Sequence, residues 1–383
     1  MKNRAGEYQQ INSGKLAYKC FSPKKLPPEP NIMQDNELIK LLADAHRLIG
    51  KLDGASDNLP DINLFVGAYI RKEALLSSQI EGTQASLDDI FDPNVNVNTN
   101  NNVVDVINYI KAINFAIERM EKLPICARLL KEIHSKLMQG VRGQEKNPGE
   151  FRKTQNWIGG MGSTLKNATF IPPSVDLMQE GISDLEKFIN EDDDMDVLIK
   201  SALIHYQFET LHPFLDGNGR IGRMLIVLYL MQRKTLNYPI LYISLFLKSN
   251  RVEYYDRLME VRNKGNFEQW IKFFLKGLSE TAEDALNSID AISNLIKCDL
   301  VKIEGLESKS VNMLYEYIKR NPIIDIKKTS QALNSSYNTI KNGIDKLIKV
   351  NVLKKSNTSL RNKTYEYYNY LEILRKDTAE NLS

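Results

Sequence analysis

The sequence predicts a mainly α-helical protein with one small β element in its main body and a separate small domain near its C-terminus. Apolar residues recur at helical spacing along most of the chain, a glycine-rich interruption falls at residues 148–173, and the pattern changes after residue 300. The 383 residues are 42% apolar and 26% charged, which is ordinary for a globular protein and enough for two or three domains.

Most of the main body is expected to be helical. The first thirty residues end in the proline-rich run FSPKKLPPEP, which predicts an extended segment over the surface. The asparagine-rich residues 92–102 predict a flexible loop, and residues 148–173, with four internal glycines, predict a short hairpin or flap. Apolar periodicity predicts helices over residues 35–52, 63–80, 103–120, 127–140, 175–190, 195–211, 223–234 and 266–296.

The last eighty residues predict a different arrangement. Helices are expected over residues 310–322, 324–334 and 335–353, followed by a hairpin with a polar tip over residues 353–370. Three helices and a hairpin resemble a winged helix-turn-helix.

Charge in this region is more positive than in the rest of the chain. From residue 300 onward 15 Lys and Arg stand against 9 Asp and Glu, an excess of six, whereas the whole chain carries +3. DNA contact is one interpretation, and a module used for protein contact or dimerisation is the other. The basic residues on the presumed third helix and wing are Lys341, Lys346, Lys349, Lys354, Lys355, Arg361 and Lys363.

Composition also excludes several classes. The first fifteen residues lack an apolar run, so no signal peptide is expected, and no stretch of about 18 apolar residues predicts a membrane span. Cys20, Cys126 and Cys298 are far apart and lack metal-ligand spacing. They fit a reducing compartment, hence a cytoplasmic location, and argue against a zinc site.

The most informative stretch is LHPFLDGNGRIGR, residues 211–223, which lies between two helix-like segments. A helix beginning near Gly217 leaves its first backbone N–H groups without partners and presents a partial positive charge, which favours an anion. Gly217 and Gly219 allow a ligand to approach the backbone, and Asn218 can bond a phosphate oxygen. The stretch therefore predicts a phosphate-binding site.

Charged residues in the same stretch fit a nucleotide triphosphate. Arg220 and Arg223 lie one turn apart and can reach the same helix end. Asp216 can hold Mg²⁺ together with phosphate oxygens, and His212 can accept a proton at neutral pH. The alternative is a plain helix–helix turn with a histidine bonded to the backbone. The fixed order of all these residue types favours the nucleotide site.

These residues resemble the signature of the Fic family. HPFLDGNGR followed by IGR meets every specified position of H-x-F-x-[DE]-G-N-G-R-x-x-R. The resemblance extends from about Tyr18 to about Asp290. It implies a Fic-type helical core and the transfer of AMP from ATP to a Ser, Thr or Tyr hydroxyl of a target protein, with release of pyrophosphate.

The resemblance also implies a role for each residue of the signature. His212 takes the proton of the attacking hydroxyl, Asp216 binds Mg²⁺, and Phe214 anchors the loop in the core. Gly219 stands where phosphorylating relatives that resemble Doc carry a lysine, which favours nucleotidyl transfer. The implied nucleotide contacts are Gly217, Asn218, Gly219, Arg220, Ile221, Gly222 and Arg223, with the two arginines on the β and γ phosphates.

Further contacts are implied outside the signature. Residues 148–160 look like the family's flap, in which Trp157, Ile158 and Gly159 align a target segment by strand-like pairing. Asn250 and Tyr254 are candidates for adenosine contact, although Tyr254 fits a buried aromatic equally well. Asn263 is a weaker candidate. His46, His134 and His205 are predicted to be core or surface histidines without a metal role.

An inhibitory motif precedes the core. SSQIEGTQ, residues 77–84, resembles the family's [ST]-x-x-x-E-[GN] motif at Ser77, Glu81 and Gly82. The resemblance implies that Glu81 pairs with Arg223 in the space that the γ-phosphate needs. One charge-assisted contact of this kind corresponds to roughly 10- to 150-fold in rate. The alternative is an exposed glutamate near a helix end.

The sequence thus predicts three parts: a Fic N-terminal region at 1–100 with the inhibitory helix, a catalytic core at 101–290, and a winged-helix-like domain at 300–383. The rival function is a nucleotide-sensing, DNA-binding transcriptional regulator, but sensing needs no base, so His212 favours the enzyme. Removal of AMP by water activated at Glu81 is compatible with the residues. Homodimer formation stays open.

Overall fold

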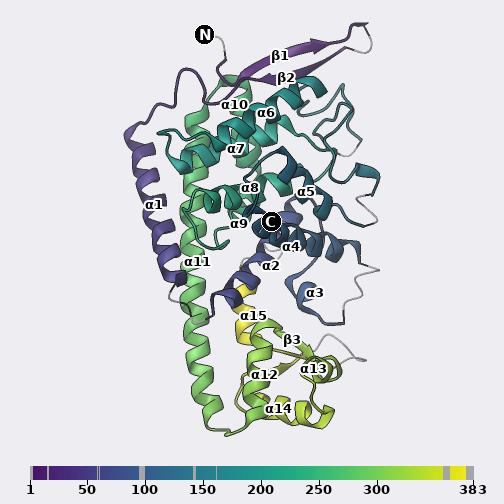
Figure 1. The fold of residues 1–383 in the computed structure, drawn as a ribbon, viewed down its shortest axis with the longest axis vertical. Helices are drawn as coiled ribbons and strands as arrows, with labels where there is room; N and C mark the ends of the chain where they lie inside the picture. Colours follow the sequence, from purple (N-terminus) through teal and green to yellow (C-terminus); the bar gives the residue numbers. More distant parts are fainter. Residues whose placement is uncertain are drawn as a thin grey trace. The chain divides into compact units, whose positions relative to one another are not determined.

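The computed structural model describes residues 3–14, 17–57, 59, 61–94, 100–140, 144–160, 162–356 and 363–376 (Figure 1). The described residues are mainly helical with two small antiparallel sheets, which confirms the predicted fold class. They group by contact into two compact units. We call Met1–Asp53 with Asn108–Ala282 the core unit, and Gly54–Ile107 with Glu283–Ser383 the C-terminal unit. The three-part division of the sequence stays a prediction.

The core unit contains a β-hairpin and most of the helices. Its elements are β1 (Gly6–Ile11), β2 (Tyr18–Pro23), most of α1 (Asn36–Asp57) and α4 (Asn101–Met120), α5 (Ala127–Leu137), a 3₁₀ turn (Gln144–Lys146), α6 (Val175–Asn190), α7 (Val197–Leu211), α8 (Asn218–Gln232), α9 (Ser244–Ser249), α10 (Arg251–Lys264) and the first part of α11 (Phe267–Glu304).

Helices α7 and α8 form the centre of the core unit. Every residue of α7 from Leu198 to Leu211 is buried, and so is α8 from Arg220 to Leu230. A helix that is buried all round lies inside its domain. Asp196 caps α7 by accepting from the Leu198 N–H at 2.8 Å. The loop between the two helices, residues 212–217, is therefore held at both ends by packed core.

The N-terminal segment forms a pair of antiparallel strands, which the predicted extended surface segment did not include. β1 and β2 pair antiparallel from Gly6↔Pro23 to Ile11↔Tyr18, and Phe21 is fully buried. The Phe21 N–H also donates to the Ile171 carbonyl at 3.0 Å. Proline content predicted extended backbone here but could not reveal this pairing.

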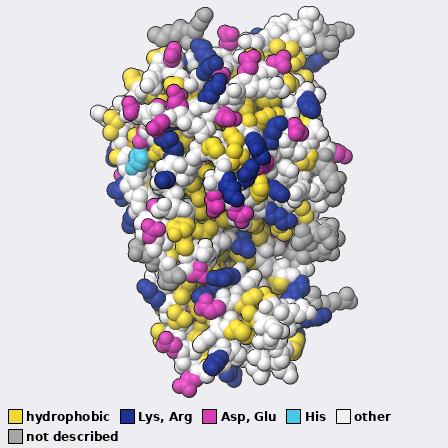
Figure 2. Space-filling view, in the orientation of Figure 1, with side chains coloured by type: hydrophobic (Ala, Val, Ile, Leu, Met, Phe, Trp, Pro, Cys, Tyr) yellow, Lys and Arg dark blue, Asp and Glu magenta, His cyan; other side chains and the backbone are white. Residues whose placement is uncertain are grey.

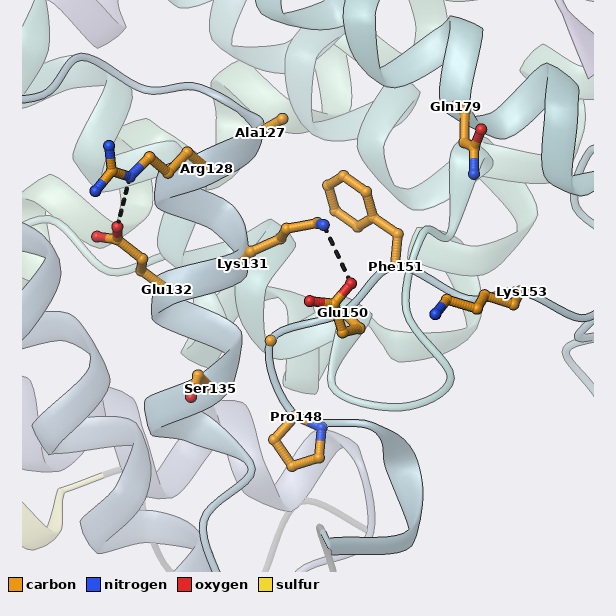
Figure 3. Close-up of a pocket in the computed structure, with 11 residues that line it drawn as sticks. Ala127, Arg128, Lys131, Glu132, Ser135, Pro148, Glu150, Phe151, Lys153 and Gln179 are labelled. Atoms are coloured by element: carbon orange, nitrogen blue, oxygen red, sulfur yellow. Dashed lines mark hydrogen bonds and ion pairs between the residues drawn. The ribbon is translucent and has the colours of Figure 1, made fainter.

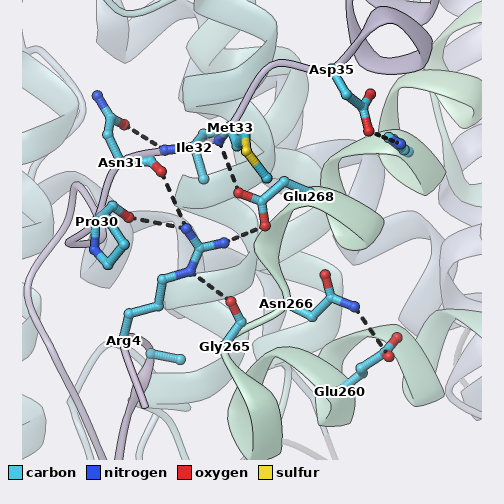
Figure 4. Close-up of polar contacts among 12 residues, drawn as sticks. Arg4, Pro30, Asn31, Ile32, Met33, Asp35, Glu260, Gly265, Asn266 and Glu268 are labelled. Carbon is cyan, nitrogen blue, oxygen red and sulfur yellow. Dashed lines mark hydrogen bonds and ion pairs between the residues drawn. The ribbon is translucent and has the colours of Figure 1, made fainter. Parts of the chain in front are cut away.

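Arg4 ties the N-terminus to the corner between α10 and α11 (Figure 4). Its guanidinium donates to the Gly265 carbonyl at 2.7 Å and to the Pro30 carbonyl at 3.0 Å, and it forms an ion pair with Glu268. Gly265 ends α10 with a φ of 71°, and a Cβ there would lie 2.9 Å from Arg4 Cγ. Glycine is therefore required at position 265, because its positive φ and the close approach of the N-terminal segment both exclude a Cβ.

The structure defines the flap and several helix boundaries in more detail than the sequence predicted. The described residues of the flap, predicted as a short hairpin or extended flap, pair through one antiparallel bridge, Ile158↔Phe170. Residues 266–296, expected as one or two helices, belong to the single long helix α11. Part of the predicted loop at 92–102 lies outside the described residues, and α4 already begins at Asn101.

The C-terminal unit joins the helix of the inhibitory motif to the last part of the chain. Its sheet has the order β3-β5-β4, and α14 packs on α12 and α13. The predicted helices and hairpin are present, whereas the winged-helix assignment itself stays a prediction. The elements are α2 (Ile62–Ile80), α3 (Leu87–Phe91), the last part of α11, α12 (Lys309–Arg320), β3 (Ile323–Asp325), α13 (Ile326–Ala332), α14 (Tyr337–Lys349), β4 (Lys354–Lys355), β5 (Thr364–Glu366) and α15 (Tyr368–Arg375).

Among the described residues, no helix combines the length and the apolar character that crossing a bilayer requires.

Candidate functional site

His212 stands at the C-terminus of α7 in a left-handed conformation, with φ 47° and ψ 60°. A residue with a Cβ pays about 1–2 kcal/mol in this region, so the surrounding structure must enforce it. The Arg152 Nε donates to the His212 carbonyl at 3.1 Å, and the Asn156 Nδ2 donates to the same oxygen at 3.2 Å. The strained residue is thus held through its carbonyl by two side chains from the start of the flap.

The same two residues also hold the carbonyls that follow. The Arg152 backbone N–H donates to the Pro213 carbonyl at 2.8 Å, and Asn156 Nδ2 donates to the Phe214 carbonyl at 2.9 Å. Sequence reasoning missed both Arg152 and Asn156. The signal that could have found them is the run of polar residues between Phe151 and Trp157 inside a segment otherwise expected to be a strand.

The Asn218 side chain is buried and hydrogen-bonds to the backbone of the loop between α7 and α8. Its Oδ1 accepts from the Phe214 N–H at 2.8 Å and its Nδ2 donates to the Phe214 carbonyl, also at 2.8 Å. Asn218 is 2% exposed and Phe214 is fully buried. This pairing closes the turn, so the part of Asn218 that remains for a ligand is its backbone N–H. The phosphate contact of its side chain stays a prediction.

The start of α8 offers an anion site of the expected kind. Gly217 precedes the helix with φ 77°, and helix geometry leaves the N–H groups of residues 218–220 without intrahelical acceptors. A partial positive charge at this end favours phosphate oxygens. Arg220 is 7% exposed, and its Nε is buried without a hydrogen-bond partner among the described residues. An unpaired buried donor beside free backbone N–H groups fits a bound anion.

The Asp216 carboxylate lies next to this end. Its side chain is 49% exposed, its Oδ1 accepts from the Gly217 N–H at 2.5 Å, and Arg220 Nη2 lies 3.5 Å from the same oxygen. The described residues contain no cluster of three or more His, Cys, Asp or Glu that would hold a metal alone. One half-exposed carboxylate is what Mg²⁺ uses when phosphate oxygens and waters complete its shell.

His134 links the loop to the flap from the other side. It is fully buried, stacks on Phe214 with ring centroids 3.9 Å apart, and accepts from the Gly149 N–H at 2.8 Å. Since its Nδ1 accepts, its Nε2 carries the proton and donates to the Asp216 carbonyl at 3.2 Å. Burial lowers the pKa of His134 to about 4, so it is neutral at pH 7. The sequence did not predict this contact, because His134 lies within a helix-like segment.

The remaining signature residues contribute to helix packing. Ile221 is 1% exposed, and Arg223 is 3% exposed. A Cβ on Gly222 would collide with the Glu209 carboxylate of α7, so this glycine allows the two helices to approach closely. Gly222 is therefore explained by packing, and its predicted contact with a nucleotide stays a prediction.

The two adenosine candidates lie around the start of α10. Asn250 precedes the helix, and its Nδ2 donates to the Phe246 carbonyl at 2.9 Å. Tyr254 is 1% exposed, and its hydroxyl lies 2.9 Å from Nε2 of His205, whose Nδ1 donates to the Gly222 carbonyl at 2.8 Å. Tyr254 thus packs in the core behind α8. Its contact with adenosine stays a prediction, as does the role of Asn263, which accepts from the Tyr8 hydroxyl.

The flap presents a short, partly exposed edge. Ile158 pairs with Phe170, with N–H···O distances of 2.8 and 3.1 Å. Trp157 is 41% exposed, and its indole N–H donates to the Ser163 carbonyl at 3.0 Å. A Cβ on Gly159 would lie 2.5 Å from Ser163 Oγ, so the tip needs a glycine there. The docking role of Trp157, Ile158 and Gly159 stays a prediction.

The inhibitory motif lies in the C-terminal unit. Ser77 is buried on α2, Glu81 is the C-cap of that helix with φ −86°, and Gly82 follows with φ 92°. The motif therefore ends a helix, as Gly82 suggested. The predicted pairing of Glu81 with Arg223 joins residues of the two units and stays a prediction.

A pocket of about 800 Å³ lies beside the flap, between α5, α6 and residues 148–153 (Figure 3). Lys131 and Glu150 form an ion pair across it at 3.2 Å, and Arg128 pairs with Glu132 at 2.8 Å. Its polar groups thus largely satisfy one another. None of the predicted nucleotide, metal or flap-docking residues lines this pocket.

Comparison with known proteins points to one family. Residues 39–118 match the Fic/DOC family N-terminal model, and residues 124–230 match the Fic/DOC family model. A curated relative from Culex quinquefasciatus, named "Protein adenylyltransferase Fic", is 34% identical over 146 residues, which cover 38% of this chain and 26% of that protein. A protein of the same name from Drosophila virilis is 26% identical over 281 residues, 69% of this chain and 53% of that protein.

A solved structure agrees on the fold. The crystal structure of a Fic family protein from Desulfovibrio desulfuricans G20 matches with a TM-score of 0.56 and 19% identity, and the match covers 88% of this chain and 97% of that one. The chain spans about half or less of the length of the curated relatives described above. Residues 39–118 and 124–230 thus form a Fic/DOC N-terminal domain and a Fic/DOC domain, respectively.

Proposed function

We propose that this protein transfers AMP from ATP to a Ser, Thr or Tyr hydroxyl of a target protein. The observation that carries the proposal is the turn between α7 and α8, where His212 in a left-handed conformation ends α7 and a short loop leads to the start of α8, whose first N–H groups have no intrahelical acceptors. The names of the curated relatives support the same chemistry.

In this mechanism the target hydroxyl oxygen attacks the α-phosphorus while its proton passes to the His212 imidazole. The bond from the α-phosphorus to the oxygen that bridges to the β-phosphate breaks, and pyrophosphate leaves. The N–H groups of residues 218–220 and the Arg220 guanidinium stabilise the phosphate oxygens. Arg223 is assigned to the same phosphates by its place in the signature.

Asp216 is the residue that would hold Mg²⁺, and the ion would supply charge neutralisation of the phosphates. Gly219, which has no side chain, leaves the space where phosphorylating relatives carry a lysine. This supports nucleotidyl rather than phosphoryl transfer. The flap residues Trp157–Gly159 would align the target backbone.

Labelled ATP tests the proposal directly. With Mg²⁺ present, ATP labelled at the α-phosphate should label the protein itself or bands of a cell lysate, whereas ATP labelled at the γ-phosphate should not. His212→Ala should abolish the labelling while the protein stays folded. Transfer of the γ label would instead show a kinase, and labelling that survives in His212→Ala would remove the assigned base.

The proposal includes inhibition by Glu81. Its position as the C-cap of α2, followed by a left-handed Gly82, gives the carboxylate a fixed place at a helix end. Glu81→Gly should raise AMP incorporation by roughly 10- to 150-fold, the range of one charge-assisted contact. Equal rates for Glu81→Gly and wild type would remove the inhibitory role. Removal of AMP by the same residue is a further expectation that assay of the modified target would check.

Partners and location remain predictions. Lys341, Lys346 and Lys349 are exposed on α14, and Tyr337 at its start is 53% exposed, which is compatible with DNA or protein contact. Arg361, a predicted wing contact, lies outside the described residues. The face drawn in Figure 2 carries positive and negative side chains interspersed. Homodimer formation and a cytoplasmic location belong to the same set of predictions.

A further inference from the structure

The burial of the Arg152 guanidinium carries a desolvation free-energy cost that its role in packing does not explain. It is 1% exposed, burial lowers its pKa to about 10, and no carboxylate lies within ion-pair distance among the described residues. Besides the His212 carbonyl, its guanidinium donates only to the carbonyls of Thr154 and Pro173, at 3.3 and 2.5 Å. An apolar side chain of similar volume would avoid the desolvation of a charge. This position therefore requires the several N–H donors that a planar guanidinium presents in a fixed geometry.

Asn156 is likewise oriented to donate hydrogen bonds to the backbone carbonyls of the loop. Its Nδ2 is shared between the carbonyls of His212 and Phe214, while its Oδ1 is buried without a hydrogen-bond partner among the described residues. A buried acceptor without a partner carries a free-energy cost. The Asn156 side chain is thus oriented so that its Nδ2 donates to the loop, although its Oδ1 is then left without a hydrogen bond among the described residues.

We propose that Arg152 and Asn156 are positioning residues that hold His212 in its left-handed conformation, so that the imidazole is placed for proton transfer. The proposal rests on the assigned role of His212. It adds a link between target docking and the base, because Asn156 directly precedes the docking residues Trp157–Gly159. Movement of the docked flap would then change the position of the carbonyls it holds.

Kinetics with matched variants test the positioning role. Asn156→Asp keeps the shape and removes the donor, and Arg152→Lys keeps the charge and removes the fork. Each should lower kcat for AMP transfer by about 10- to 100-fold and leave the KM for ATP within about twofold. Gln155→Ala is the control, because its side-chain amide donates to the backbone carbonyls of Pro172 and Asn156 and not to the carbonyls of residues 212–214. Its kcat should match that of the wild type.

An NMR measurement keeps the test independent of activity. The chain has four histidines, so ¹³C-labelled histidine gives four ring signals that His→Gln variants assign. Asn156→Asp and Arg152→Lys should shift or broaden the His212 signal and leave that of His46 unchanged. Unchanged His212 signals in both folded variants would overturn the positioning role even if the wild type proved to transfer no AMP. A rise in KM for ATP with constant kcat would also overturn it.

A second, independent observation concerns the C-terminal unit. Arg320, the last residue of α12, pairs with Asp61, the N-cap of α2, at 2.8 Å. Arg375 of α15 pairs with Asp88 of α3 at 2.8 Å. The inhibitory motif forms the end of α2 and the start of the segment that leads to α3, so α2 and α3 are both ion-paired to the last part of the chain. α12 also packs on α2.

Packing near the middle of α2 strengthens the connection. The Arg71 guanidinium is buried, which lowers its pKa, and its surroundings include Tyr370 of α15. Tyr370 is 1% exposed. We infer that the C-terminal segment 309–376 sets the position of the inhibitory helix, and hence the strength of the Glu81 effect. This inference rests on the proposed inhibition.

Removing the two arginines tests the inference; the Arg375 change also removes its ion pairs with Glu366 and Glu372 in the same unit. Arg320→Ala combined with Arg375→Ala should raise AMP incorporation by about 3- to 10-fold, since an exposed pair contributes up to about 1 kcal/mol. The same pair of changes in the Glu81→Gly background should add nothing. Lys319→Ala is the control, because it loses an ion pair with Glu316 and a cation–π contact with Tyr315, both within α12, and leaves the Arg320–Asp61 and Arg375–Asp88 ion pairs in place.

The outcomes separate the two proposals. A rise for Glu81→Gly without a rise for the double variant would overturn the coupling and leave the inhibition intact. No rise for Glu81→Gly would reject the inhibition itself. In either case, hydrogen exchange of residues 62–80 should be faster in the double variant than in Lys319→Ala, and equal exchange would also overturn the coupling.

Discussion

At the residue scale, the site depends on backbone conformations that side chains elsewhere enforce. His212 has a positive φ without being glycine, and donors from Arg152 and Asn156 surround its carbonyl. The sequence identified His212 and Asp216 because their residue types and spacing carry chemistry. It did not identify Arg152, Asn156 or His134, because each of them acts through backbone groups, and the only signal for the first two was the run of polar residues between Phe151 and Trp157.

Buried histidine also makes stability depend on pH. Burial lowers the pKa of His205 to about 4, against about 6.5 in an unfolded chain. Between these values the unfolded chain binds a proton that the folded chain does not, so the free energy of unfolding falls as pH drops from about 6.5 to 4. This group accounts for a loss of up to about 3 kcal/mol over that window.

Urea unfolding of the wild type and of His205→Gln at pH 7 and pH 5 measures this slope. The variant should lose less stability on acidification than the wild type. His46→Gln should behave oppositely, because the hydrogen bond that the His46 Nε2 donates to the Asp196 carboxylate raises the pKa of His46, and its contribution is present at low pH and lost as pH rises. Identical slopes in all three proteins would contradict the assigned environments.

At the element scale, apolar periodicity located the long helices and missed the irregular elements. α7 and α8 were predictable because the segments around LHPFLDGNGR are strongly apolar. β1 and β2 were not, since their pairing depends on a distant contact between Phe21 and Ile171. Helix ends shifted by a few residues where capping decided them, as at Asp196 before α7.

Arg4 gives a stability prediction for the N-terminal element. Arg4→Ala removes an ion pair with Glu268 and the side-chain donor to the Gly265 carbonyl, which keeps only the Phe267 N–H among the described residues. The free energy of unfolding should fall by about 2–3 kcal/mol. Arg47→Ala, which loses an exposed pair with Asp44, should change it by less than about 0.5 kcal/mol. Chemical denaturation of both variants compares the two, and equal losses would contradict the anchoring role.

At the scale of the whole molecule, the chain combines a core unit with the signature and a C-terminal unit with the inhibitory motif. The sequence order did not predict this grouping, because α2 lies near the start of the chain and α12 near its end. Periodicity describes neighbours along the chain, whereas a unit is defined by contacts between distant segments. The family resemblance covers the signature but does not specify which elements accompany α2.

The central claim is that the start of α8 binds the triphosphate beside His212. A crystal structure of His212→Ala with ATP and Mg²⁺ tests it most directly, because the variant should bind ATP without turning it over. We expect phosphate oxygens within hydrogen-bond distance of the N–H groups of residues 218–220 and of Arg220 Nε, and the α-phosphate beside residue 212. A triphosphate bound elsewhere, with residues 218–220 facing only solvent, would contradict the account.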